Sequence, residues 1–119
     1  MKVKCVKLVD RATGNPVDRD DWLTVGKSYN VVFIEKPKDG SELFRIVGDD
    51  ASKKPLLFDA SSFEILEEVD GSWVSETSPS GTLRIGPREF MSPGFWGNLF
   101  EGEIQEKKIF EEVVSSLNC

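Results

Sequence analysis

LTVGKSYNVV, residues 23–32, is the stretch of this sequence that indicates its fold. Gly26 lies where a β-turn would separate a short apolar approach from a strand, and glycine adopts the positive φ angles of such turns at little cost. After the turn, the alternate side chains of Tyr29, Val31 and Phe33 can all face one core. We therefore expect a strand over residues 29–36 that is buried on one face.

The chain around this stretch continues a pattern of short strands and turns. Lys38-Asp39-Gly40-Ser41 contains the Asp-Gly pair typical of tight hairpins, so residues 42–48 can form the returning strand. The other elements that we expect are a first strand over residues 2–9, a strand over 55–59, a helical turn at 61–63 and a last strand over 63–68. Five short strands with turn chemistry between them predict a small antiparallel barrel of the SH3-like kind. Such a barrel favours a binding module over an enzyme.

The texture of the chain changes after Val69. Residues 70–82 are rich in Ser, Gly and Thr and predict a loop, with a short strand at Trp73-Val74 and an edge strand at 83–85. A helix is expected over about 103–117, because apolar residues recur there on one helix face: Ile109, Phe110, Val113, Val114 and Leu117. The sequence thus predicts one mainly β domain over 1–119, with a barrel core at 3–69 and a loop-rich extension at 70–119.

The composition excludes several classes of function. The chain of 119 residues has 39% apolar and 30% charged residues, no histidine and two cysteines. A structural zinc site normally takes four nitrogen or sulfur ligands, so such a site is close to excluded. The missing histidine also removes the commonest general base and the Ser-His and Cys-His nucleophile pairs. We expect no catalytic residues, no metal, no cofactor and no small-molecule substrate.

The charge of the chain points to the kind of partner. Residues 1–60 hold 11 Lys+Arg against 10 Asp+Glu, a net charge of +1, and residues 61–119 hold 4 against 11, a net charge of −7. An acidic surface repels nucleic acid and anionic lipid and attracts basic proteins. No stretch approaches the roughly 20 apolar residues that cross a bilayer, and charges interrupt the first ten residues. We expect a cytoplasmic protein that binds neither nucleic acid nor membrane.

Two kinds of side chain are candidates for contact with a partner. Carboxylates could set the register with a basic surface, and tryptophans among polar residues could serve as aromatic anchors. The candidate residues are Glu67, Glu68 and Asp70, which fall within four residues with no intervening cation, then Asp49, Asp50, Trp22 and Trp73. The aromatic cluster Phe90, Phe95, Trp96 and Phe100 could be either core or interface, and burial preferences favour core.

The segments LTVGKSYNVV, FRIVGDD and LLFDASSFEIL together resemble the small SH3-like domains of bacterial and phage proteins. The resemblance covers about residues 3–69. The second half, with LRIGP and GFWGNLFEGE ahead of a terminal helix, is similar in layout to immunity proteins of polymorphic bacterial toxins, including contact-dependent inhibition systems. This resemblance implies a non-catalytic protein that binds one cognate toxin domain, such as a nuclease, and covers its active site. An alternative is a phage or mobile-element accessory domain that binds a host or structural protein.

Overall fold

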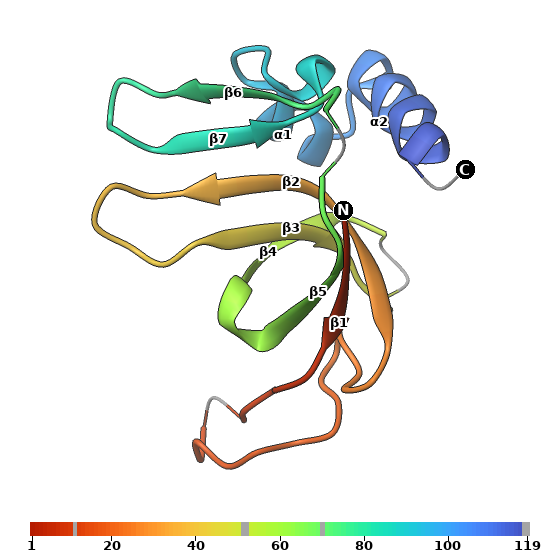
Figure 1. Cartoon of the computed structure of the whole chain (residues 1–119). Coiled ribbons are helices and arrows are strands. Elements are labelled where there is room, and N and C mark those ends of the chain that lie inside the picture. Colours follow the sequence, from red (N-terminus) through yellow and green to blue (C-terminus); the bar gives the residue numbers. More distant parts are fainter. Residues whose placement is uncertain (11, 51–52, 70, 118–119) are drawn as a thin grey trace.

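The computed structural model describes residues 1–10, 12–50, 53–69 and 71–117, and among these more residues are in β-strands than in helices (Figure 1). The strands are β1 (Lys2–Cys5), β2 (Ser28–Lys36), β3 (Leu43–Val47), β4 (Pro55–Asp59), β5 (Phe63–Glu67), β6 (Val74–Thr77) and β7 (Leu83–Gly86). The helical elements are the 3₁₀ turns η1 (Ala60–Ser62) and η2 (Arg88–Phe90) and the α-helices α1 (Phe95–Phe100) and α2 (Ile104–Leu117). None of the described helices has the length and apolar character needed to cross a membrane.

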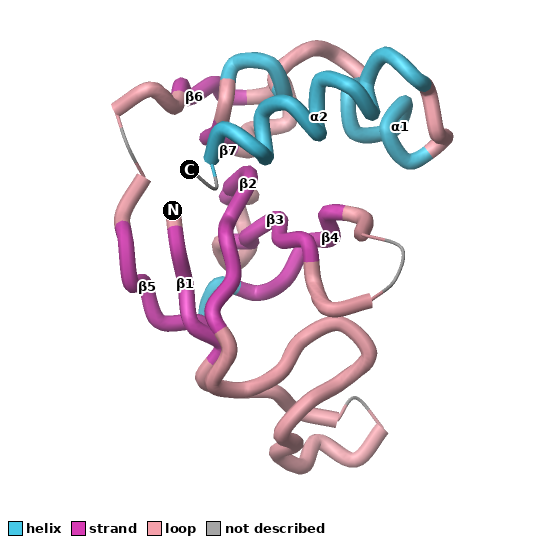
Figure 2. The backbone as a smooth tube through the Cα atoms, turned by 90° about the vertical axis from the view of Figure 1, so that its right-hand side faces the viewer, coloured by secondary structure: helices cyan, strands magenta, loops and turns pink. Residues whose placement is uncertain are grey.

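The sheet is organised around β2. Five strands pair antiparallel in the order β4-β3-β2-β1-β5, and Figure 2 shows β5 and β4 at opposite edges of this path. The start of β2 pairs with β1, whereas its last residues, Ile34 to Lys36, pair with β7, which in turn pairs with β6. Among the described residues no pairing joins β4 to β5, so backbone hydrogen bonds do not close the sheet into a barrel. The helices lie at the end of the molecule where β6 and β7 lie (Figure 1).

Most of the expected elements are confirmed, with small changes of length. Gly26 has a φ of 90° in the turn before β2, and β2 and β3 pair as a hairpin. The predicted strand over 55–59 is β4, and the predicted C-terminal helix is α2. The first strand is shorter than expected, because β1 ends at Cys5 and Val9 makes only an isolated bridge to Pro16.

The expectation that Tyr29, Val31 and Phe33 face one core is wrong for Phe33. Tyr29 and Val31 are buried in a first core, but Phe33 belongs to a second one. The register of β2 against β3 shifts between Val31 and Phe33, as it does at a β-bulge. A one-residue shift moves the following side chains to the opposite face of the sheet. Neighbouring Val32 and Phe33 consequently both pack under the helices, and Ile34 returns to the first core.

The second core is largely aromatic and settles the role of the cluster at 90–100. Phe90, Phe95 and Trp96 are 0%, 3% and 9% exposed, whereas Phe100 is 36% exposed. The cluster is therefore core except at Phe100. The ring centroids of Phe33 and Trp96 are 5.3 Å apart, a distance typical of favourable aromatic pairs. Phe110 of α2 stacks on Phe90 at 5.6 Å, which fastens the helix to the sheet.

The buried side chain of Arg45 packs against this second core. The guanidinium of Arg45 lies 4.3 Å from the ring centroid of Trp96 and donates hydrogen bonds to Glu35 and to the carbonyl oxygen of Pro55, at 3.2 and 2.9 Å. Burial lowers the pKa of Arg45, and the carboxylate of Glu35 partly offsets that effect. Arg45 thus links three strands of the sheet to α1.

Candidate functional site

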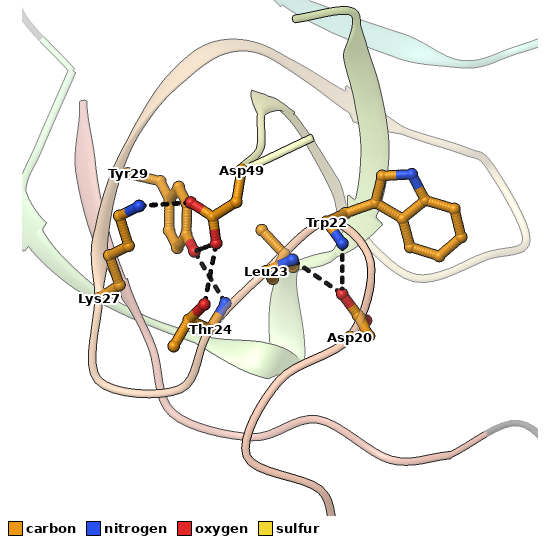
Figure 3. A network of polar contacts seen from close by, with 7 residues as sticks. All are labelled: Asp20, Trp22, Leu23, Thr24, Lys27, Tyr29 and Asp49. Carbon is orange, nitrogen blue, oxygen red and sulfur yellow. Dashed lines mark hydrogen bonds and ion pairs between the residues drawn. The ribbon is translucent and has the colours of Figure 1, made fainter. Parts of the chain in front are cut away.

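Asp49 fastens the turn before β2 to the end of β3 (Figure 3). Its carboxylate accepts hydrogen bonds from Thr24 Oγ1 at 2.9 Å and from the Tyr29 hydroxyl at 2.8 Å, and it forms an ion pair with Lys27. The Tyr29 hydroxyl accepts a hydrogen bond from the backbone N–H of Thr24 at 2.8 Å. Every polar group of this network therefore has a partner within the chain.

The electrostatics of the network keep Asp49 ionised. Burial would raise the pKa of Asp49, but hydrogen bonds from Lys27, Tyr29 and Thr24 together outweigh burial and hold this pKa below its ordinary value. Burial, together with the Asp49 carboxylate, raises the pKa of Tyr29 to about 12. Asp49, predicted as a contact for a partner, is thus engaged in holding the fold.

Asp50 and Trp22, also predicted as contacts, lie near this network. Asp50 is half-buried. The backbone N–H groups of Trp22 and Leu23 donate to Asp20 Oδ1 at 2.8 and 2.7 Å, which shapes the turn. The Trp22 indole points away from Asp49 (Figure 3) and packs, half-buried, against the first core. Trp22 is therefore not the exposed anchor that its polar neighbours in the sequence suggest.

The carboxylates at the end of β5 are exposed but have cations beside them. Glu67 ends β5, Glu68 follows it, and Asp70 lies outside the described residues. The register places Lys2 of β1 opposite Glu67 and Lys4 opposite Glu64. Side chains directly opposite each other on neighbouring strands interact. Glu67 and Glu68, the first candidates for partner contact in the sequence, therefore lie on a surface where acidic and basic side chains are neighbours.

Trp73 is the predicted residue that lies in a concave surface. It lines a groove of about 530 Å³ between α2 and the segments at 72–73 and 87–89. Its half-buried indole packs against the first core, and Ile109 and Val113 of α2 add apolar surface. The exposed carboxylates in the lining are Glu89 and Glu112, and Arg88 is the one cation among the lining residues. We call this surface the Trp73 groove.

A second groove lies along another side of α2. It has a volume of about 490 Å³, and its apolar lining comes from both the sheet and the helix: Val32, Val47, Phe110 and Val114. Its charged lining residues are of both signs, namely Lys2, Lys27, Lys53, Asp49 and Glu111. Because these charges largely balance, this groove favours neither a basic nor an acidic partner.

The sequence does not identify Glu89 and Glu112 as candidate contacts, because they are 23 residues apart in the chain. Only the fold brings both of them into the lining of the Trp73 groove. One local signal existed for Glu112, which directly precedes Val113 in the apolar stripe of α2.

The described residues contain no group of three or more His, Cys, Asp or Glu side chains able to hold a metal ion.

We compared the chain with protein families, curated proteins and solved structures. No protein-family model, curated protein or solved structure matches this chain.

Proposed function

We propose that this chain is a non-catalytic immunity protein, which binds a cognate bacterial toxin domain and blocks its active site. The observation that carries the proposal is the Trp73 groove, which is lined by a half-buried indole and by the carboxylates of Glu89 and Glu112. Aromatic anchors in well-packed pockets dominate the energy of protein interfaces. A lysine or arginine of the partner would lie over the indole, where the cation is attracted to the ring, and would be held by the carboxylates.

The charge distribution supports a basic partner. Nine carboxylates of the second half are exposed: Glu64, Glu67, Glu68, Glu76, Glu89, Glu101, Glu103, Glu111 and Glu112. A nuclease presents a basic groove that normally holds phosphates, and an acidic inhibitor can occupy that groove. Long-range attraction then speeds association, whereas contacts that lose water slow release.

The proposal includes an SH3-like strand arrangement for the first half, in an open form whose edge strands β4 and β5 are not hydrogen-bonded to each other among the described residues. The strand order β5-β1-β2-β3-β4 and the 3₁₀ turn η1 between β4 and β5 are compatible with such a core over residues 3–69. β6, β7 and the helices then form the extension. Trp73 lies near the start of the extension and packs against the first core, and the groove that it lines is formed by residues of the extension.

The proposal is tested by co-expression with the toxin domain encoded beside this gene. The chain should protect cells from the toxin and co-purify with it as a stoichiometric complex. The double variant Glu89→Lys/Glu112→Lys should bind at least about tenfold more weakly, because both carboxylates face the basic partner. If cells that produce both proteins in the cytoplasm are killed as readily as cells that produce the toxin alone, the proposal is contradicted.

The matched control is Glu67→Lys/Glu68→Lys, which makes the same change of net charge on exposed residues at the end of β5. This variant should keep affinity within a few-fold of wild type, apart from a general loss of attraction that salt removes. If the control weakens binding and the groove variant does not, the toxin binds at β5. A gene neighbourhood made of structural phage genes would instead favour the accessory role.

A further inference from the structure

The two edges of the five-strand path are built differently. At β5, Lys2 lies opposite Glu67 and Val3 opposite Ile65, so Leu66 is an extra residue in the pairing. Charged side chains at Glu64 and Glu67 flank this irregularity. Bulges and charges are devices by which edge strands avoid pairing with other chains. β5 is therefore a protected edge.

β4 has neither device in its central part. Its pairing with β3 runs from Leu43–Asp59 to Val47–Pro55 over five consecutive residue pairs without a shift. Pro55 is its first residue, the place where a strand tolerates proline. Leu57 at its centre is 38% exposed, and among the described residues β4 pairs with β3 alone. A regular apolar edge of this kind is a template for a further strand.

We propose that β4 pairs antiparallel with β4 of a second copy of this chain, with Leu57 on the two-fold axis. In this register Leu57 meets its own counterpart, Leu56 lies opposite Phe58, and Pro55 lies opposite Asp59. Such a contact is isologous and closes after two subunits. The proposal concerns the β4 edge and does not depend on the toxin.

The charges around β4 favour a second copy as the occupant. In this register Asp59 of each chain lies opposite Pro55 of the other chain, at the end of the strand that follows Lys53 and Lys54, and no like charges are directly opposed along the strand. Opposite charges on paired strands are favourable, and like charges directly opposite are unfavourable. Antiparallel self-pairing therefore brings the acidic end of each β4 to the basic end of the other.

Apolar surface continues beyond the strand. A groove of about 520 Å³ at the start of β4 has an apolar lining of Pro55, Leu99, Phe100 and Phe110. Its charged lining residues are of both signs, namely Lys53, Lys54, Lys107, Glu101 and Glu111. Phe100 is the member of the aromatic cluster that the second core leaves 36% exposed. A neighbouring chain paired to β4 would cover part of this surface, so the contact is not limited to backbone hydrogen bonds.

Sedimentation velocity of the full chain over a wide concentration range tests the proposal. We expect a reversible monomer–dimer equilibrium. Leu57→Lys and Leu57→Glu should each weaken the dimer at least about tenfold, because like charges then face each other on the axis. An equimolar mixture of the two variants should form a heterodimer, because the introduced charges are then opposite. Circular dichroism shows whether each variant is folded.

The matched control is Ile65→Lys on the protected edge, where the side chain is 44% exposed. This variant should dimerise like wild type. A wild-type chain that stays monomeric at every concentration overturns the proposal. It is equally overturned if Ile65→Lys dissociates the dimer as Leu57→Lys does, or if the mixture of folded variants remains monomeric.

Discussion

Asp49 joins two segments of the chain by accepting hydrogen bonds from Thr24 and Tyr29 and pairing with Lys27, which precede it by 20 to 25 residues. Its side chain is 26% exposed, so water screens these contacts only in part. The close approach of the same segments is also visible at Gly48, where a Cβ atom would lie 2.4 Å from the carbonyl oxygen of Trp22. The turn predicted at Gly26 is thus held in place by contacts with Gly48 and Asp49, which follow β3.

Asp49→Asn should lower the free energy of unfolding at neutral pH by about 1–2 kcal/mol, because a hydrogen-bonded charge is lost. The pKa of Asp49 is lower in the folded chain than its ordinary value. Its contribution to stability is therefore present above the unfolded pKa of about 3.9 and is lost as pH falls through the folded pKa. Urea unfolding at several pH values should show a smaller acid loss in the variant.

The control for this prediction is Asp21→Asn, which alters an exposed carboxylate outside the network. It should leave stability within about 0.5 kcal/mol of wild type at every pH. Equal effects of the two substitutions would show that the Asp49 network adds nothing to stability.

Gly86 ends β7 directly against the ring of Phe33. A Cβ atom at Gly86 would lie 2.3 Å from Phe33 Cδ1, so Gly86→Ala must displace a buried ring. We expect a loss of about 1–3 kcal/mol in the free energy of unfolding. Gly97→Ala is the matched control, because a Cβ atom there meets nothing within 4 Å. Since alanine favours a helix over glycine, that variant should be neutral or more stable by up to about 1 kcal/mol in thermal or urea unfolding.

Among the elements, the amphipathic helix α2 is anchored to the rest of the fold by one buried aromatic residue, Phe110. Phe110 is 9% exposed and contacts the rings of Phe90 and Trp96, whereas Ile104 at the start of the helix is 76% exposed. Phe110→Ala should therefore lower the free energy of unfolding by about 3 kcal/mol or more, through lost burial and the cavity left behind.

Ile104→Ala is the control for the same helix and should change stability by less than about 0.5 kcal/mol. Urea unfolding followed by circular dichroism measures both variants. If the two substitutions have the same effect, α2 is not anchored through its aromatic contacts.

The elements also show which parts of the fold could be predicted. β4 and α2 were predictable because an apolar run between turn residues and a helical stripe are local signals. α1 was not, since Gly94 and Gly97 suggest a broken segment, and burial of Phe95 and Trp96 in the second core outweighs that weak propensity. The irregularity of β2 between Val31 and Phe33 has no local signal either.

For the candidate site, the sequence names single residues but does not show which of them lie together. Trp73 was predicted as a contact for a partner because it stands among polar residues, and the structure places it in the lining of a groove. The carboxylates at Glu67 and Glu68 looked acidic without interruption, but pairing of β5 with β1 puts Lys2 beside them. Strand register is a contact between distant parts of the chain, and the sequence alone does not reveal it.

At the scale of the whole molecule, residues 70–119, which carry β6, β7 and the α-helices, hold 8 Asp+Glu against 4 Lys+Arg, a net charge of −4. The first half, with a net charge of +1, supplies most of the sheet. A basic partner is therefore attracted to the extension. In our account, the Trp73 groove provides the contact and the surrounding carboxylates the approach.

Hydrogen exchange of the chain in complex with its toxin domain tests this claim most directly. We expect backbone amides at 72–73, at 88–89 and along the second half of α2 to exchange more slowly in the complex than in the free chain. Amides of β5 should be unchanged. Slower exchange confined to β5, with the groove exchanging as in the free chain, would show that the partner does not bind at the Trp73 groove.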